Sequence, residues 1–432
     1  MTDVNPNGAQ QHDASAINSS RTEASSTVTS PAPAASSTAS GSKLATAPAA
    51  KRQLTVRELN LSLVAHAIFD AAQPPSRADV AAVTGLARAT VSSLVDSLLT
   101  AHIVTEMPPT SGGAGRPAIP LMAGQRSLVG LGLEVSVDYL AVTAVDLRGE
   151  QVAQVIQEAQ LADSQPLPVL RDLGLLARQV VDSVTQRGMR VVGGRLAVPG
   201  LVDQHTGILE VAPNLGWTSV DPVAGLELPD IDIQVANEAK LAALAEYAAS
   251  GTQSFLYISP EIGIGGAIVV DGTLFGGERG WNGEVGHVVV DPTGPQCRCG
   301  ARGCLEQYLG RDVVLAAGGM PAGASVEDMA QAAASGDRQV LAALDGAGRA
   351  LGCALADFIN LVGVHTVIIG GQFAALVPWM LRRMRQELTT RVLAAPYSGV
   401  EVGASVVGPQ AALVGGAREV LRHVVDNPAA YL

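Results

Sequence analysis

The chain has 432 residues, of which 47% are hydrophobic and 16% charged, and this length suits two or three domains with large buried cores. Its formal net charge of −12 argues against nucleic acid as a partner of the whole surface, and its four cysteines are too few for a disulfide framework. The sequence shows no signal-peptide pattern and no run of about 18 uninterrupted apolar residues, so we expect a cytoplasmic protein.

The charge is distributed unevenly along the chain. Residues 1–50 carry two basic and three acidic side chains, a net charge of −1, whereas residues 51–126 carry seven basic and five acidic side chains, a net charge of +2. Residues 127–432 therefore hold the remaining −13. The small basic part is compatible with a nucleic-acid contact that the acidic remainder disfavours.

Residues 1–50 consist mainly of Ser, Thr, Ala and Pro, with almost no large apolar side chains. Such a composition cannot bury enough apolar surface to offset the entropy of the chain. We therefore predict a disordered low-complexity tail, and a tail without a specific function is the favoured interpretation.

The segment 54–105 predicts three helices. In the first, Leu59, Leu63 and Ala67 recur at helical spacing, and the helix ends at the Pro74-Pro75 pair, because proline can neither donate a backbone hydrogen bond nor tolerate a helical residue before it.

A short second helix follows at once. Ser76 with Asp79 three residues later is typical of a capping box, in which each side chain accepts a hydrogen bond from the other residue's backbone. Gly85 ends this helix, because glycine adopts the left-handed conformation at little cost.

The third helix is predicted over ARATVSSLVDSLLTAH. Its apolar stripe consists of Val91, Leu94, Val95 and Leu98. Its opposite face is small and polar, as a helix in a DNA major groove requires, and consists of Arg88, Ala89, Thr90, Ser92 and Ser93. Any amphipathic surface helix also has a polar face, but here the short helix, the glycine turn and a following hairpin occur in the order of a winged helix–turn–helix.

The hairpin is predicted from HIVTE and AIPLM on either side of a turn rich in proline and glycine. Arg116, within Gly-Arg-Pro near the end of that turn, would suit the narrow minor groove of AT-rich DNA, where negative potential is concentrated. Residues 51–126 are thus predicted to form a winged helix–turn–helix domain that binds operator DNA.

From residue 127 onward, apolar strands alternate with amphipathic helices, which predicts an α/β domain of two lobes. The predicted strands are LVGLGLEV, YLAVTAVDL, VVGGRLAVPG, SFLYIS and HTVIIGG. The predicted helices are VLRDLGLLARQVVDSVTQ, NEAKLAALAEYAA and the runs near 341–360 and 376–393.

A histidine and three of the four cysteines lie within residues 287–304. His287, Cys297, Cys299 and Cys304 supply one nitrogen and three sulfurs, the soft ligand set that zinc binds tetrahedrally. Such a closed set leaves no position for a reactive water, so we predict a structural metal; free thiols are the alternative interpretation. Cys353 lies apart in a helical run and is expected to be a small core residue.

Four motifs resemble those of the ROK family (repressors, open reading frames and kinases), specifically its transcriptional regulators with an N-terminal winged helix. They are SRADVAAVTGLARATVSSLVDSLL with GRP, VPGLVDQHTGILEVAPNLGW, NGEVGH and CRCGARGCLE, between residues of about 54 and 375. The last two, at this spacing, are highly specific. The resemblance implies an α/β actin-like (ribonuclease H-like) fold over residues 127–432, with a sugar site in the cleft between two lobes.

The resemblance also implies residues for that site. The four ligands named above would hold the family's structural zinc. A sugar would be contacted by Gly200, Asn214, Asn237, Glu238, Glu284, His287 and Glu306. Family kinases carry an Asn-Asp pair at the position of Asn237 and Glu238, and that aspartate is the general base of phosphoryl transfer. Carboxylates, amides and an imidazole in one pocket can pair with vicinal hydroxyls and reject ligands that leave them unpaired.

The sequence departs from the family kinases at both phosphate loops. Glu134 lies within the first, where the kinases have Asp-x-Gly-Gly-Thr, and Glu261 lies within the second, where they have Gly-Thr-Gly-x-Gly. Glycines let amide groups approach phosphate closely. At a separation of roughly 5 Å and an effective dielectric of about 20, each carboxylate–phosphate pair would cost about 3 kcal/mol. We therefore expect no catalysis, and a cleft that senses a sugar or sugar phosphate.

These features predict a sugar-responsive transcriptional regulator, acting as a repressor of carbohydrate-metabolism genes, that assembles as a homodimer or homotetramer. One alternative is an ATP-dependent sugar kinase with an appended DNA-binding domain. Another is an empty cleft in a large domain that serves for dimerisation or protein docking.

Overall fold

The computed structural model describes residues 55–109 and 118–432, and these belong to one compact unit. The predicted tail and Arg116 lie outside the described residues. No single described helix combines the length and hydropathy needed to cross a membrane; α2 (Arg77–Thr84) and α3 (Arg88–Thr100) pass that test only together, as a pair bent by 117°.

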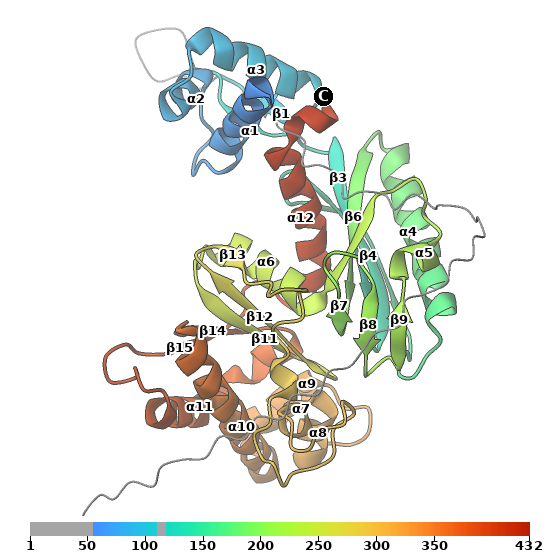
Figure 1. The fold of residues 1–432 in the computed structure, drawn as a ribbon, viewed down its shortest axis with the longest axis vertical. Helices are drawn as coiled ribbons and strands as arrows, with labels where there is room; N and C mark the ends of the chain where they lie inside the picture. The colour runs from blue at the N-terminus through green and yellow to red at the C-terminus, as the bar shows by residue number, and fades with distance from the viewer. Residues whose placement is uncertain (1–54, 110–117) are drawn as a thin grey trace, which may run out of the picture. The chain divides into compact units, whose positions relative to one another are not determined.

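Three helices and a two-stranded hairpin form the N-terminal part of the described chain (Figure 1). They are α1 (Val56–Phe69), α2, α3, β1 (Val104–Glu106) and β2 (Leu121–Ala123). The capping box of Ser76 and Asp79 begins α2, and Gly85 ends it with a φ of 71°. The stripe predicted for α3 is buried, and β1 pairs with β2 in antiparallel fashion. The predicted winged helix is thus confirmed over its described residues.

The face of α1 that is buried is not the face whose apolar spacing predicted the helix. Leu59 and Leu63 are 52% and 44% exposed. The face turned to the core consists of Leu61, Val64, Ala65 and Ile68. The spacing predicted the helix correctly but would have assigned the wrong side to the core, because both sides of this helix carry apolar residues at helical intervals.

The first lobe is a five-stranded sheet in the order β10-β6-β3-β4-β5. Its strands are β3 (Leu128–Val135), β4 (Tyr139–Asp146), β5 (Gln151–Glu158), β6 (Arg190–Val198) and β10 (Ile233–Asn237). Helix α4 (Pro166–Gln186) covers one face and α12 (Ala411–Asp426) the other (Figure 1). Beside it lie α5 (Pro222–Leu226) and a small sheet of β7 (Leu201–Val202), β8 (Leu209–Ala212) and β9 (Trp217–Val220).

The second lobe is a five-stranded sheet in the order β13-β12-β11-β14-β15. Its strands are β11 (Phe255–Pro260), β12 (Ile264–Val270), β13 (Thr273–Leu274), β14 (Thr366–Ile369) and β15 (Glu401–Ala404). Its helices are α6 (Glu238–Ser250), α7 (Glu306–Leu309), α8 (Arg311–Ala317), α9 (Val326–Ala334), α10 (Arg338–Val362) and α11 (Val377–Arg391). Short 3₁₀ turns are η1 (Val285–His287), η2 (Gln372–Leu376) and η3 (Pro428–Tyr431). Every strand and helix predicted from residue 127 onward is present, within a few residues of its expected bounds.

The winged helix shares its hydrophobic core with α12. One buried cluster contains side chains of α1, α2 and α3 together with Ala417, Leu421, Val424 and Val425 of α12. Polar contacts lie beside it: the His66 ring nitrogens are each 2.9 Å from a carboxylate, of Asp70 and of Asp426. Arg422 also donates to Asp70 at 2.9 Å. The division of the chain near residue 126 stays a prediction, and this cluster extends across it.

Candidate functional site

A loop over residues 287–304 brings the predicted metal ligands together. A backbone bridge joins Val289 to Cys304, and Gly303 lies so near the carbonyl of Asp291 that a Cβ there would be 1.5 Å from its oxygen. The ligand atoms that all lie within 4.8 Å of one another belong to His287, Cys297, Cys299 and Cys304. The predicted cluster therefore exists in three dimensions.

The spacing within this cluster suits a tetrahedral ion. Sulfur ligands at about 2.3 Å from a tetrahedral zinc lie about 3.8 Å from each other. The Cys299 and Cys304 sulfurs are 3.7 Å apart, and the Cys297 sulfur is 3.8 Å from Nδ1 of His287. Three sulfurs and one imidazole nitrogen at these separations could hold a metal ion without large rearrangement.

The cluster adjoins a cavity of about 740 Å³ that lies between the two lobes. This volume is in the upper part of the range of about 300–1,000 Å³ typical of small-molecule sites. His287 and Cys299 line both the cluster and the cavity, and the Cys297 sulfur is 3.9 Å from an oxygen of Glu306. A metal in the loop would thus stabilise one wall of the cavity.

All seven residues predicted to contact a sugar line this one cavity. They are Gly200, Asn214, Asn237, Glu238, Glu284, His287 and Glu306. They come from the turn after β6, the β8–β9 turn, the β10–α6 junction, η1 with the residue before it, and the start of α7. The geometry brings them together, while their role as sugar ligands stays a prediction.

Asn237 is the last residue of β10 and caps the N-terminus of α6. Its oxygen accepts from the backbone of Ala239 and Lys240 at 3.0 and 3.3 Å, and its nitrogen donates to Gly200 O at 3.2 Å and to Glu238 at 2.8 Å. In this arrangement all its polar capacity is used, so Asn237 orients Glu238 and the turn after β6. A sugar that binds the amide of Asn237 must displace one of these contacts.

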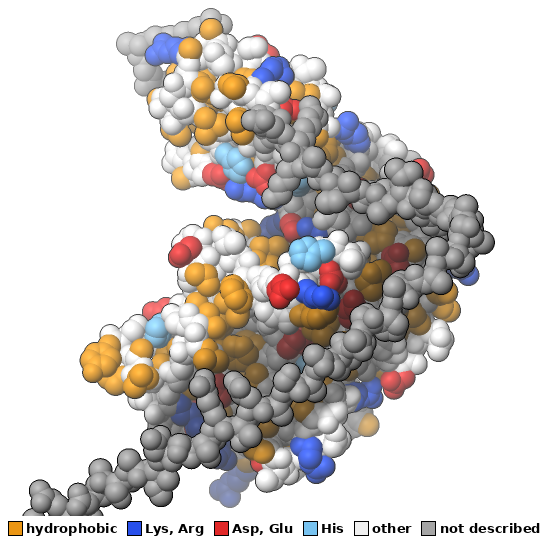
Figure 2. Space-filling view, viewed as in Figure 1, with side chains coloured by type: hydrophobic (Ala, Val, Ile, Leu, Met, Phe, Trp, Pro, Cys, Tyr) orange, Lys and Arg blue, Asp and Glu red, His pale blue; other side chains and the backbone are white. Residues whose placement is uncertain are grey.

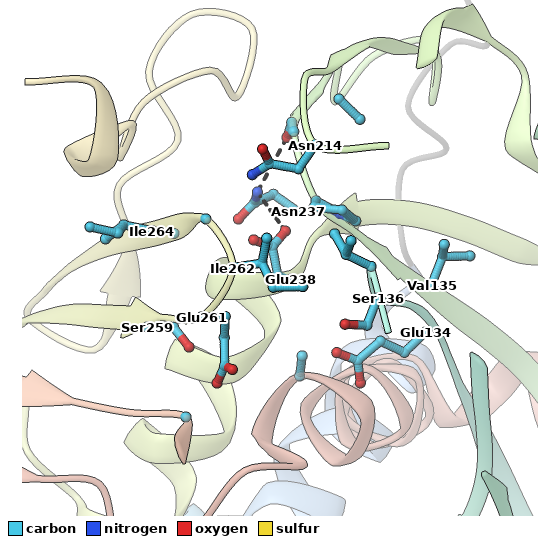
Figure 3. Close-up of a pocket in the computed structure, with 18 of the residues that line it drawn as sticks. Glu134, Val135, Ser136, Asn214, Asn237, Glu238, Ser259, Glu261, Ile262 and Ile264 are labelled. Carbon is cyan, nitrogen blue, oxygen red and sulfur yellow. Dashed lines mark hydrogen bonds between the residues drawn. The ribbon is translucent and has the colours of Figure 1, made fainter. Parts of the chain in front are cut away.

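Figure 3 shows Asn214 and Asn237 above Glu238, with Glu261 to its lower left and Glu134 to its lower right. Burial, together with the nearby Glu284 carboxylate, raises the pKa of Glu238 to about 8. Burial likewise raises the pKa of Glu134 and of Glu261 to about 7. Two fully ionised carboxylates were expected here; part of the population is protonated at neutral pH, so that expectation overstates their charge.

Several cavity residues were not identified from the sequence. Arg311, at the start of α8, donates to Asp138, in the β3–β4 turn, at 2.6 Å, and this ion pair joins the two lobes across the cleft. Tyr139 donates to Glu134 at 2.9 Å, and the backbone of Gln372 donates to Glu261 at 3.1 Å. Arg311 and Asp138 are 173 residues apart, and no local pattern links them.

The predicted DNA-reading face of α3 is open to solvent over most of its length. Arg88, Ala89, Thr90 and Ser93 are exposed, and Ser92 is half-buried. The residue before the helix, Ala87, provides no side-chain cap for the first backbone N–H groups of α3. Helix N-termini of this kind favour phosphate oxygens.

We predict that Glu261→Gln stabilises the protein at alkaline pH. Glu261 has a pKa of about 7 in the folded protein and of 4.5 in the unfolded chain, so between these pH values the folded protein keeps a proton that the unfolded chain releases. The free energy of unfolding therefore falls as pH rises through this window. The variant should therefore exceed the wild type by about 1–3 kcal/mol at pH 8, and the gain should shrink toward pH 4.5. Urea unfolding measures it, the exposed Glu401→Gln is the control, and a loss of stability at pH 8 would contradict the account.

The chain is similar to known proteins over most of its length. A xylose repressor from Bacillus subtilis (strain 168) is 28% identical over 380 residues, which are 87% of this chain and 98% of that protein. A crystal structure of a ROK family transcriptional regulator, a homologue of the E. coli MLC protein, is 26% identical with a TM-score of 0.73, over 86% of this chain and 97% of the other.

A ROK family glucokinase from Streptomyces griseus, solved with glucose and AMPPNP, is 23% identical with a TM-score of 0.58, over 67% of this chain and 98% of its own. This similarity supports the actin-like two-lobed fold. The winged helix and the lobes thus match a regulator over almost its full length, and the lobes alone match a kinase. The family model described as "ROK family" matches residues 130–422, and the chain belongs to the ROK family.

Proposed function

We propose that this chain is a sugar-responsive transcriptional regulator, acting as a repressor, that binds operator DNA through its winged helix. One observation carries the proposal: a single chain combines a winged helix that exposes a small polar recognition face with a cavity lined by all seven predicted sugar contacts. The similarity to a xylose repressor over 87% of the chain supports it. The ligand would be a saccharide, because carboxylates and amides on several walls match a ring of hydroxyls.

The proposed ligands of the sugar are Asn214, Glu284, Glu306 and His287, with Glu238 oriented by Asn237. The cavity lies between lobes, so a ligand that contacts both would favour one relative arrangement of them. A hundredfold bias toward one arrangement requires about 2.7 kcal/mol of differential binding free energy. We propose a homodimer or homotetramer, since paired recognition helices read two half-sites.

We propose no enzymatic activity. Glu134 and Glu261 line the part of the cavity where kinases of this fold bind phosphate, and Arg311, which also lines it, is paired with Asp138. Phosphoryl transfer depends on cations and backbone amides that hold the phosphates in line. A cavity wall of carboxyl groups does not supply those cations.

We propose that the metal is zinc and that it is structural, on the basis of its three thiolate ligands and one imidazole. Its role would be to hold the loop that supports Glu306 and His287 in the cavity wall.

Cys304→Ser should release the metal and weaken sugar binding together. Cys304 is a buried member of the cluster, and loss of one ligand should lower metal affinity by at least roughly 10–100-fold. Atomic emission measures bound metal, and calorimetry with a panel of monosaccharides measures binding. Cys353→Ser is the matched control, since its thiol contacts Glu387 on α11 instead, and full sugar affinity without metal would refute the supporting role.

Arg88→Ala should weaken DNA binding by about 10–100-fold without changing sugar affinity, because the exposed guanidinium lies at the N-terminus of the recognition helix. Fluorescence anisotropy would use a fragment selected by the wild type from random-sequence DNA. Arg385→Ala, exposed on α11, is the control. Equal loss of both affinities would indicate misfolding instead.

Purified protein should consume no ATP above background with any sugar of the panel. Sugar-dependent ATP consumption that Glu238→Ala abolishes would instead support the kinase interpretation. If the protein neither binds a sugar of the panel nor consumes ATP, the interpretation as a docking platform with an empty cleft is favoured instead.

A further inference from the structure

A glycine-rich loop leads directly into Glu284, one of the proposed sugar contacts. Residues 275–283, with the sequence FGGERGWNG, lie between β13 and that glutamate, and we call them the glycine loop. Gly277, Gly280 and Gly283 have φ values of 63°, 82° and 95°, a conformation that other residues adopt only at a cost. Glycine thus permits a backbone path that other residues would strain, and this path ends at Glu284.

The turn between β7 and β8, on the first-lobe side of the cavity, holds the glycine loop by its carbonyl groups. Gln204 donates from its backbone to the carbonyl of Arg279 at 3.0 Å and from its amide to that of Glu278 at 3.3 Å. Nε2 of His205 lies 3.1 Å from the same Glu278 oxygen. A Cβ on Gly280 would lie 3.2 Å from Cβ of Gln204, so glycine lets the two segments approach closely. Figure 2 shows histidine, acidic and basic side chains gathered between the two lobes.

A buried lysine holds the same loop from the side of α6. Lys240 is 8% exposed, and its ammonium donates to the carbonyl of Gly280. Burial lowers the pKa of Lys240, against the opposing effect of the nearby Glu284 and Glu238 carboxyl groups. A buried ammonium needs partners that compensate its lost hydration. Here the partners are a carbonyl of the glycine loop and the carboxyl groups of the cavity wall.

The glycine loop does not satisfy its own polar groups. Nε1 of Trp281 and Oδ1 of Asn282 are buried without a hydrogen-bond partner in the described chain. Nδ2 of Asn282 donates to the carbonyl of Phe275 and closes the loop on itself. Buried polar atoms without partners cost free energy. This arrangement of the loop therefore depends on contacts from outside it, and those contacts come from Gln204 and Lys240.

The residues that hold the loop lie outside the cavity. Among the described residues, the cavity lining includes Glu284 but not Gln204, His205 or Lys240. Any effect of these three side chains on a ligand in the cavity must therefore pass through the loop and reach the ligand at Glu284.

We propose that Gln204 and Lys240 are positioning residues for the effector: each fixes the glycine loop, and the loop fixes Glu284 at the sugar. This inference rests on the proposed function and goes beyond it, because it assigns ligand affinity to residues outside the cavity. Gln204 lies on the side of the first lobe, so the loop also ties Glu284 to the arrangement of the two lobes. A ligand that holds Glu284 then favours the arrangement in which Gln204 contacts the loop.

Calorimetry with a panel of uncharged monosaccharides, xylose and glucose among them, tests this on the full, metal-loaded chain. Gln204→Ala and Lys240→Met should each weaken binding of the sugar that the wild type binds by about tenfold, because each frees the loop that carries Glu284. Gln331→Ala, exposed on α9, is the control and should leave the affinity unchanged. If the wild type binds a sugar and either variant binds it as tightly, the inference is wrong and the proposed function stands. If the wild type binds no sugar, both are overturned.

A double-mutant cycle with Glu284→Gln separates positioning from a general loss of stability. If Gln204 acts through Glu284, Gln204→Ala should weaken binding about tenfold in the wild type but less than about twofold in the Glu284→Gln protein. The same change combined with Glu306→Gln should be additive, since Glu306 belongs to α7 and not to the loop. Additive losses in both cycles would overturn the positioning role.

Trp281 reports on the loop itself in the absence of sugar. Its fluorescence is the difference between each protein and its Trp281→Phe counterpart, and quenching by acrylamide measures its exposure. Gln204→Ala and Lys240→Met should raise this quenching by about twofold, whereas Gln331→Ala should not. Unchanged quenching in variants that have lost sugar affinity would show that they act by another route, and the inference would be wrong.

Discussion

Four glutamates line the cavity between the two lobes: Glu134 is buried, and Glu238, Glu261 and Glu284 are half-buried. Burial raises the pKa of each of them, which means that the folded protein tolerates these groups best when they are protonated or bonded to a ligand. Two separate hydrophobic cores, one in each lobe, supply the stability that offsets this cost. Ligand binding therefore relieves a cost that folding has created.

Much of the fold could be predicted because its patterns are local. The strand of Leu128–Val135 is continuously apolar, and α2 begins and ends with unambiguous capping residues, so each was predicted closely. The metal ligands lie within eighteen residues, and their types alone indicated their chemistry. The family motifs then identified cavity residues that are distant in the sequence.

Other features could not be predicted because they depend on packing. The Arg311–Asp138 pair joins residues 173 positions apart, and one carboxylate oxygen of Glu134 is buried without a partner in the described chain. The exposed side of α1, with Leu59 and Leu63, resembles its buried side in composition, so spacing alone could not choose between them. Charge states also required the structure, because burial moves the pKa of Glu134 and Glu261 to about 7.

Helix α12 links the two functions in one piece of secondary structure. Its first residues, Ala411 to Leu413, line the cavity, and its later turns complete the core of the winged helix, where His66 meets Asp426 across 360 positions of sequence. Ribosomes synthesise α1 long before α12. A nascent chain therefore presents a DNA-reading unit that lacks one wall of its core, and this unit becomes complete only after both lobes, and the cavity between them, have been made.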